Sequence, residues 1–423
     1  MTSKVKTTGA PLPVKPRLEI KEFMANKKQF SLYVQALNTL YSELKTEVLS
    51  YFSLSKIHGR PFGPWNNVDP PLNPQGQPKG FCVHHEIQFL TWHRPYVALF
   101  EQEIYKRANS IAKEYKADSE AWIQAASDLR QPYWNWADPS GILPQALLDL
   151  FFKDSVTIGP ASKDGAESSV SNPFCLYHFK DGERDGFTTD PPTPVVDWPQ
   201  TLRYPTSKGP EARSNMTKFN TMLNLEGDRI RYDTERLSSL TTWKAFSSDG
   251  GKTTNSLEKI HDDMHDLIGG IFDGGHMSRI PFAAFDPIFW LHHAQIDRLT
   301  DKWHSERQLW APDADHKPFR NSDTSDTFWN SNQIQEPKSF NYEYKPAMQR
   351  QPGWGKEFGL VDEDTILEWS VRIRYKAFEL GGNFSILLFF TEDESPIPED
   401  PHDRYDLFLL PNYIGSFNTF INP

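Results

Sequence analysis

Apolar residues recur at helical spacing in several stretches of this chain, and these stretches predict its main helices. They are residues 22–45, 84–115, 256–270 and 286–308. The last stretch has a strong start signal, because Asp286 is a good N-cap residue and Pro287 would occupy the first helical position. Gly269 and Gly270 supply a stop for the preceding helix. The pattern therefore predicts a mainly α protein.

The other segments are expected to be irregular or β. Residues 1–16 form a Pro-containing arm, and residues 138–215 are rich in Pro, Gly, Ser and Asp, which is typical of long irregular loops. Residues 369–376 alternate apolar and polar side chains and predict a half-buried strand, and the turn ELGGN leads from it into a second strand. The predicted organisation is a core (residues 1–344), a linker (345–366) and a β-rich segment (367–423).

Composition and charge exclude several classes of protein. The formal net charge is −11 and no Lys- or Arg-rich run occurs, which argues against nucleic acid or an anionic membrane as a partner. The longest apolar run, ILLFF, is far too short to span a bilayer. The first residues lack the apolar core of a signal peptide, and Cys82 and Cys175 are the only cysteines. We therefore expect a soluble, cytoplasmic protein.

The candidate chemistry lies in histidines on or beside the predicted helices. They are His58, His84, His93, His261, His265 and His293. His261 and His265 are four residues apart, so both imidazoles project from one face of their helix. An all-imidazole set without thiolates suits copper or zinc. Di-iron bundles use a Glu-x-x-His motif on each of two helices, whereas the predicted helices carry one, Glu258 to His261.

Two interpretations of this set stay open at this point. The stretch HDDMH resembles the HExxH pattern of zinc hydrolases, with Asp262 in the place of the general-base Glu. A single zinc ion takes three protein ligands, however, and would leave the histidines near residues 58–93 unused. Six histidines from two helical halves fit two metal ions better than one. His292 and His293 are adjacent and lie about 100° apart on a helix, so they rarely serve the same small site.

The stretches around these histidines resemble the two copper signatures of tyrosinases. HHEIQFLTWHRPYVALFE is similar to the first signature and DPIFWLHHAQID to the second. KIHGRPFGPW, LRQPYWNWAD, SLEKIHDDMHDLIGG and GHMSRIPFAAFDPIFWLHH resemble fungal members of the family, over residues from about 17 to 344 and weakly beyond. The resemblance implies a mainly α fold, in which an antiparallel four-helix bundle carries a dinuclear copper site among long irregular loops.

The resemblance also implies how two copper ions are held. The first ion would be held by His58, His84 and His93, and the second by His261, His265 and His293. The second signature places its ligand four residues before Asp297, which selects His293 rather than His292. Cys82, two residues before His84, matches a cysteine that forms a thioether to that ring in fungal members. A buried free thiol is the alternative for Cys82.

Further positions match functional positions of the family. Glu258 matches a glutamate that holds a water, and such a carboxylate could act as the base for a phenol, whose pKa lies near 10. An exposed helix residue is its alternative. Asp262 is expected either to bind the same water or to be a solvated helix residue. Phe289 is expected to pack under the copper pair, Ile280 to form a gate over the first copper, and His292 to make hydrogen bonds behind the ligands. Phe289 and Ile280 could equally be plain core residues.

Two residues depart from the family pattern. The second signature usually reads HHAN, and Gln295 replaces that Asn, which puts the surroundings of the ligands in doubt. His85 directly follows His84, where small residues are common. It would either disturb the site or face outward.

The end of the chain resembles the lid of latent fungal tyrosinases. Tyr342 and Tyr344 match the Tyr-x-Tyr motif that ends the catalytic core, and Arg17 matches a residue that ties the N-terminus to it. The strands after residue 366 resemble the start of a lid that plugs the copper pocket with an aromatic side chain. Phe378 is the candidate plug, and an ordinary hairpin aromatic is the alternative.

The implied activity is that of a tyrosinase, which uses two copper ions and O2 to hydroxylate monophenols and to oxidise o-diphenols to o-quinones. Ile280 is smaller than the Phe at this position in plant catechol oxidases, which implies easier access for a monophenol. A catechol oxidase that acts on o-diphenols alone is the first alternative, and a haemocyanin-like oxygen-binding protein is the second. The expected partners are small phenols and O2, with no nucleic acid and no membrane, and a homo-oligomer stays open.

Overall fold

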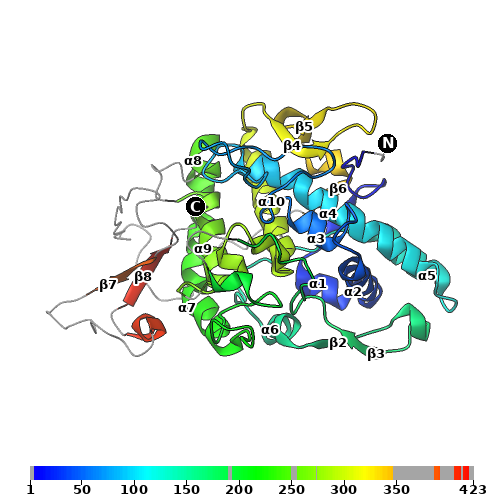
Figure 1. Cartoon of the computed structure of the whole chain (residues 1–423), viewed down its shortest axis with the longest axis horizontal. Coiled ribbons are helices and arrows are strands. Elements are labelled where there is room, and N and C mark those ends of the chain that lie inside the picture. Colours follow the sequence, from blue (N-terminus) through cyan, green and yellow to red (C-terminus); the bar gives the residue numbers. More distant parts are fainter. Residues whose placement is uncertain are drawn as a thin grey trace.

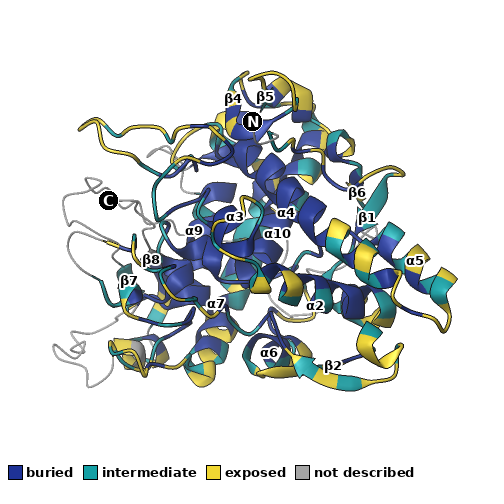
Figure 2. Ribbon diagram, turned by 45° about the vertical axis from the view of Figure 1, so that its right-hand side comes forward, coloured by how far each residue is buried: buried dark blue, intermediate teal, exposed yellow. Residues whose placement is uncertain are grey.

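The computed structural model describes residues 4–188, 193–248, 255–272, 274–345, 385–390, 404–410 and 413–418. A four-helix bundle lies at its centre (Figure 1). Its helices are α2 (Lys27–Ser42), α4 (Phe89–Ala112), α9 (Leu257–Gly269) and α10 (Ile288–Arg307). Helix α4 contacts both α2 and α10, and α10 contacts α9. Figure 2 shows α4, α9 and α10 buried over most of their length, so the bundle forms the core of the protein.

Further helices and two-stranded sheets surround the bundle. The helices are α1 (Ile20–Ala25), α3 (Tyr51–Ser55), α5 (Ser119–Asp128), α6 (Gln145–Phe152), α7 (Met216–Arg236) and α8 (Trp243–Ser247). The strand pairs are β1 (Lys15–Arg17) with β6 (Tyr342–Tyr344), β2 (Ser155–Ile158) with β3 (Ser168–Ser171), β4 (Asp315–Arg320) with β5 (Phe328–Asn330), and β7 (Ser385–Phe389) with β8 (Tyr413–Asn418). The pair β1–β6 is parallel and the other pairs are antiparallel.

The four predicted helices are present, with changes at their ends. The first stretch is split in two, because Asn26 ends α1 and its side chain accepts a hydrogen bond from the Gln29 N–H at the start of α2. Helix α4 begins at Phe89, so His84 lies in the loop before it rather than on the helix. Helix α10 begins at Ile288 with Pro287 as its N-cap, one residue later than predicted, and Asp286 Oδ1 accepts from the Ile288 N–H at 2.9 Å.

The pattern missed helix α7, and the prediction of irregular loops over residues 138–215 was partly wrong. Helix α6 and the β2–β3 hairpin lie within that segment. Helix α7 is long but mostly polar, and its buried residues are Phe219, Met222, Leu223, Glu226 and Ile230. Their spacing of three, four and seven residues is helical, and Asn215 caps the helix by accepting from the Lys218 N–H. These two signals could have revealed the helix.

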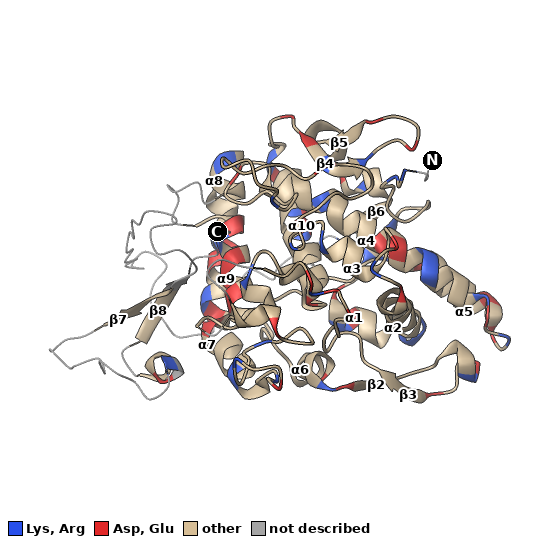
Figure 3. Ribbon diagram, viewed as in Figure 1, with Lys and Arg blue, Asp and Glu red and all other residues tan. Residues whose placement is uncertain are grey.

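Helix α7 braces α9 through charged side chains, and acidic residues gather along both helices (Figure 3). Arg229 on α7 donates to Asp263 on α9 at 3.0 Å. It also donates to two residues of its own helix, Glu226 at 2.6 Å and Asp233 at 3.2 Å. The Tyr413 hydroxyl of β8 donates to the same Glu226 at 2.5 Å. The helix that carries His261 and His265 is therefore held from outside by α7, which is itself bonded to the C-terminal segment, and β8 also contacts α9.

The prediction of two strands in the C-terminal segment is confirmed in part. Strand β7 coincides with the predicted second strand, and its described partner is β8. The preceding strand over residues 369–376, Phe378 and the linker beyond Lys345 lie outside the described residues. Within the described part of the chain, no helix is long and apolar enough to cross a membrane.

The two ends of the core meet at a buried carboxylate, Asp297. Arg94 donates to Asp297 at 2.6 Å and Arg17 donates at 3.2 Å, while the hydroxyls of Tyr342 and Tyr344 donate at 2.5 and 2.7 Å. The Arg17 guanidinium also lies 3.5 Å above the centre of the Tyr342 ring. Burial by itself raises the pKa of Asp297, but Arg94 and Arg17 outweigh it and hold that pKa below its ordinary value. The predicted tie between Arg17 and the Tyr-x-Tyr motif is confirmed.

Replacing Asp297 should strongly destabilise the protein. Asp297→Ala leaves two buried guanidinium groups without this carboxylate, and breaking such a buried pair costs about 3–5 kcal/mol. Urea unfolding followed by tryptophan fluorescence measures the loss. The control is Asp128→Ala, which removes a surface pair with Lys15 of the same N-terminal arm and should cost about 0–1 kcal/mol. Equal small effects of the two substitutions would contradict the assigned role of Asp297.

Candidate metal centre

The candidate ligands come from separate parts of the chain. His58 follows α3, His84 lies in the loop before α4, His93 lies on α4, His261 and His265 lie on α9, and His293 lies on α10. His84 is half-buried and the other rings are buried. Buried polar side chains need partners, so this concentration of imidazoles in the core requires an explanation.

The rings of the first predicted set are in mutual contact. The ring centroid of His58 lies 5.2 Å from that of His84 and 5.6 Å from that of His93. The centroids of His84 and His93 are also 5.6 Å apart. The loop before α4, the start of α4 and the turn after α3 therefore converge at one point.

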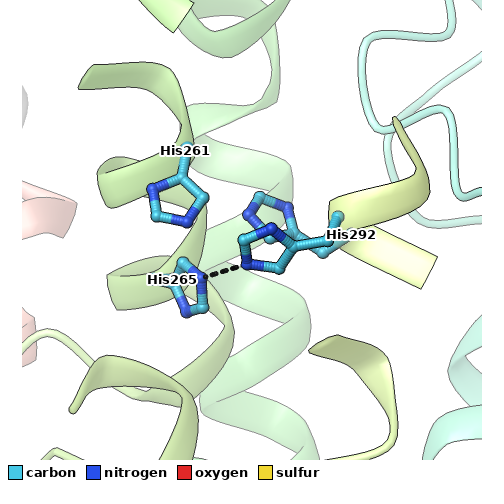
Figure 4. Close-up of side chains that lie close together, drawn as sticks. His261, His265 and His292 are labelled. Atoms are coloured by element: carbon cyan, nitrogen blue, oxygen red, sulfur yellow. Dashed lines mark hydrogen bonds between the residues drawn. The ribbon is translucent and has the colours of Figure 1, made fainter. Parts of the chain in front are cut away.

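The rings of the second predicted set converge in the same way. The centroid of His261 lies 4.4 Å from that of His265 and 4.9 Å from that of His293. His265 Nε2 lies 3.3 Å from His293 Nε2. Figure 4 shows His261 and His265 on one helix with His292 opposite them. The one-turn spacing on α9 thus places both of its imidazoles opposite α10.

The two sets adjoin each other. His93 stacks on His293 with centroids 4.4 Å apart and planes 17° from parallel, and His84 lies 5.8 Å from His261. His293 has a ring nitrogen within 4.8 Å of nitrogens of His58 and His93, and a ring nitrogen within 4.8 Å of nitrogens of the α9 histidines. The sequence separates these histidines by up to 235 positions, and the fold brings them into one cluster.

Backbone carbonyls fix the tautomers of three of these rings. Nδ1 of His58, His93 and His265 lies 3.0, 2.8 and 2.7 Å from the carbonyl oxygens of Ile280, Phe89 and Met277, respectively. A carbonyl oxygen can only accept, so each Nδ1 carries the hydrogen and each Nε2 keeps its lone pair. Such hydrogen bonds orient imidazole ligands in metal sites.

Burial keeps the imidazoles neutral. Burial first, and the neighbouring His265 second, lower the pKa of His58 to about 3. Burial is also the first cause of pKa values well below the ordinary range for His84, His93, His261, His265 and His293. Neutral imidazoles are ready to bind a metal without losing a proton.

Comparison with known proteins identifies the family. The model of the common central domain of tyrosinase matches residues 48–306. The chain belongs to the tyrosinase family. It is 32% identical to polyphenol oxidase 4 of Agaricus bisporus over 478 aligned residues, which cover 98% of this chain and 74% of the relative.

Solved tyrosinase structures agree with this result. A copper-bound mutant of active tyrosinase from Aspergillus oryzae is 26% identical with a TM-score of 0.70, covering 81% of this chain and 95% of that one. An oxygen-bound mutant of the pro-tyrosinase from the same organism is 26% identical with a TM-score of 0.82, covering 99% of this chain and 86% of that one. The tyrosinase family has a dinuclear copper centre, and the histidine groups fit such a centre because their nitrogens face one another and are neutral.

Cys82 lies where the tyrosinase pattern places its cysteine. Its thiol is buried and donates to the His58 carbonyl at 2.9 Å, and burial raises its pKa to about 12. Sγ also lies within 4.8 Å of ligand nitrogens of both His58 and His84. The thiol is therefore held beside the ring to which the thioether is expected.

Glu258 and Asp262 are both buried, so the alternative that each is a solvated helix residue is wrong. Glu258 Oε1 accepts from the His85 backbone N–H at 2.5 Å. Asp262 Oδ1 lies 2.9 Å from His261 Nδ1, so this carboxylate orients His261 and leaves its Nε2 as the ligand atom. The same contact removes Asp262 from the place of a zinc-hydrolase base.

Phe289 and Ile280 also lie against the cluster. The Phe289 ring packs 4.1 Å from that of His293 and 5.0 Å from that of His58, as expected for a residue beneath the metal pair. Ile280 is fully buried, and its carbonyl orients His58. The gate role of its side chain stays a prediction.

The two departures from the family pattern do not disturb the cluster. Gln295 donates to Asn135 Oδ1 at 2.9 Å and accepts from Arg298 Nε at 2.8 Å, so its amide is engaged by these two residues. His85 is exposed, and its φ of 59° turns the backbone N–H toward Glu258. This loop therefore connects the first histidine set to helix α9.

His292 differs from its prediction. It was expected to make hydrogen bonds behind the ligands, yet neither ring nitrogen has a hydrogen-bond partner among the described residues. One of its nitrogens instead lies within 4.8 Å of nitrogens of His261, His265 and His293. No local pattern indicated this position, because the motif assigns a ligand role to His293 alone.

Proposed function

We propose that this protein hydroxylates monophenols at the ortho position and oxidises the resulting o-diphenols to o-quinones with O2. The observation that carries the proposal is the cluster of neutral imidazoles contributed by α4, α9, α10 and the loops beside them. Copper ions held by His58, His84, His93 and by His261, His265, His293 would supply O2 binding and electron transfer. Ile280 supports monophenol access, since it is smaller than the Phe of plant catechol oxidases.

Glu258 is the residue proposed to take the phenol proton, through a water. An ionised carboxylate offers about four acceptor sites, so the bond from His85 leaves capacity to hold a water. Glu258 stands one turn before His261 on α9, beside the ligand cluster. Phenols titrate near pH 10, so hydroxylation at neutral pH requires such a base.

Glu258→Gln should impair monophenol oxidation selectively. The amide keeps an acceptor for the His85 N–H but cannot take a proton. We expect kcat/KM for tyramine to fall by about 10²–10⁴-fold. Catechol should be affected less, because its adjacent hydroxyls stabilise the anion. Raising the pH should restore part of the tyramine activity. The control is Glu120→Gln, in the exposed first turn of α5.

The same assays test the whole proposal. An enzyme that oxidises catechol but not tyramine would be restricted to diphenols, and one that binds O2 without oxidising either would be a carrier. Copper analysis accompanies each assay. A copper-loaded Glu258→Gln variant with unchanged tyramine activity would remove Glu258 from the reaction.

We also infer a thioether between Cys82 Sγ and a ring carbon of His84, supported by the position of the thiol within the His58–His84 group. The bond replaces one S–H and one ring C–H, and the two electrons and two protons pass to O2. Mass spectrometry should find the peptide lighter by two hydrogens, with Cys82 resistant to alkylation. Cys175 is the alkylated control, and an alkylated Cys82 in copper-loaded enzyme would refute the bond.

The C-terminal segment is proposed to restrict access to the site. Active tyrosinase covers 81% of this chain, whereas the pro-tyrosinase covers 99%. Phe408 is buried and its ring lies 5.6 Å from that of Phe272, so this segment is docked on the core. Phe378→Ala, or cleavage within residues 345–366, should raise kcat/KM for catechol. Phe390→Ala, an exposed aromatic of the same segment, should not. Unchanged activity in both tests would refute a plug.

A further inference from the structure

A groove of about 880 Å³ lies along α10, apart from the histidine cluster. Its lining comes from the second half of α10, the loop between α5 and α6, the end of α7 with the turn that follows it, and α8. None of the six candidate copper ligands is among the described residues that line it. Its volume falls within the roughly 300–1,000 Å³ of small-molecule sites. The groove is therefore large enough for a ligand of its own.

Aromatic and aliphatic side chains form part of the lining. Trp303 of α10 and Phe246 of α8 are buried and stack on each other, with ring centroids 4.2 Å apart and planes 7° from parallel. Leu299 and Tyr133 add further apolar surface. Aromatic side chains pack well against other rings, either offset or edge to face. This lining suits a ligand with an aromatic ring.

Two cations line the same groove. Arg298 and Lys302 lie four residues apart on α10, so they occupy the same face of the helix. The Lys302 side chain is exposed, and its ammonium has no ion pair or hydrogen bond within the described part of the chain. Like charges at this spacing repel each other. An anion that contacts both removes this repulsion.

Arg298 is held in position by two neutral amides. Its Nε donates to Gln295 Oε1 at 2.8 Å, and its Nη2 donates to Asn135 Oδ1 at 3.1 Å. The guanidinium also lies 4.9 Å from the centre of the Tyr133 ring. Neither amide supplies a negative charge, and Nη1 makes no hydrogen bond with a described residue. Gln295, which departs from the tyrosinase pattern, thus helps to present an oriented guanidinium, which lowers the cost of binding an anion.

The carboxylates of the lining already have partners. The ion pairs, at 2.5, 2.5 and 3.0 Å, are Glu22 with Lys345, Asp138 with Lys21, and Glu306 with Arg307. Glu235 is exposed and is engaged as well. Within the described lining, the charges without a counter-charge are therefore the positive ones of Arg298 and Lys302.

We propose that this groove binds an aromatic carboxylate, such as a phenolic acid, at a site separate from the copper centre. The ring of the ligand packs against Trp303 and Leu299, and its carboxylate accepts hydrogen bonds from Arg298 Nη1 and Lys302 Nζ. Hydrogen bonds between ionised partners are roughly twice as strong as neutral ones. The site uses neither copper nor the histidines, so it does not depend on the proposed function.

Calorimetric titration of the copper-loaded protein with naphthoate tests the proposal. Naphthoate has an aromatic ring and a carboxylate but no phenolic hydroxyl, so it is not a substrate for phenol oxidation. We expect it to bind, and the neutral naphthamide to bind at least about fivefold more weakly. Salt should weaken the binding of naphthoate, because part of the groove is open to solvent.

Substitutions of Lys302 locate the binding site. Lys302→Gln should weaken naphthoate binding about fivefold, and Lys302→Glu about tenfold or more, because it replaces an attraction by a repulsion. Lys302→Arg keeps the charge and should retain binding. The control is Lys27→Glu, which changes an exposed lysine of α2 that does not line the groove and should leave the affinity unchanged. Near-ultraviolet circular dichroism confirms that each variant is folded.

Three results would overturn the proposal. Absence of naphthoate binding would mean that the groove is not a site for this class of ligand. Equal affinities for naphthoate and naphthamide would mean that the cations do not recognise the carboxylate. Binding unchanged by Lys302→Glu would place the ligand elsewhere, as in the copper pocket. No phenol oxidation enters these measurements, so a failure of the proposed function is detected separately.

Discussion

The orientation of helix α10 depends on buried carboxylates near both ends of its histidine-bearing part. Just before the start, Asp286 pairs with Arg203 at 2.8 Å and also accepts from the Ile288 N–H of the first turn. Farther along, Asp297 accepts from Arg94, from Arg17 and from two tyrosines. Buried ion pairs tolerate little displacement, because moving one partner leaves a charge without compensation. His292 and His293 lie between these two points, so their directions are set by residues that never touch a metal.

Nearby polar groups orient the histidines of the site through hydrogen bonds. The loop between α9 and α10 presents the carbonyls of Met277 and Ile280 to one histidine of each set. The short segment that carries both carbonyls therefore aligns ligands in the two halves together. Asp262 does the same for His261 from the helix itself. Nδ1 of His58, His265 and His261 is therefore held by the protein, which leaves Nε2 of each ring for a metal.

These buried neutral imidazoles also tie copper binding to stability. Nε2 of His58 and of His93 has no hydrogen-bond partner among the described residues. Each such atom costs free energy in the metal-free protein, and bound copper removes that cost because the nitrogens become ligands. Helix α7 holds the outer face of α9 through Arg229 and Asp263, and β8 in turn holds α7 through the hydrogen bond from Tyr413 to Glu226, so both contacts oppose loosening of the site.

Local sequence signals predicted much of this protein. Helical spacing located the bundle helices, Asp286 marked the start of α10, and the fixed spacing of the copper signatures selected the candidate ligands. Helix α7 was not predicted, because its apolar stripe is narrow and its surface is strongly charged. The partners of Glu258 and Gln295 were not predicted either. Glu258 binds a backbone N–H and Gln295 binds a side-chain amide, both far away in sequence, and no local pattern encodes such contacts.

The sequence by itself determined which residue types could bind copper and on which helices they stand. Only the tertiary structure decided where each imidazole points. Neighbouring residues on a helix diverge by about 100°, so the sequence favoured one of His292 and His293. The structure turns both toward α9, because the rotation of α10 about its own axis is set by Arg17, Arg94 and Arg203, which lie between 83 and 280 positions from the carboxylates they bind.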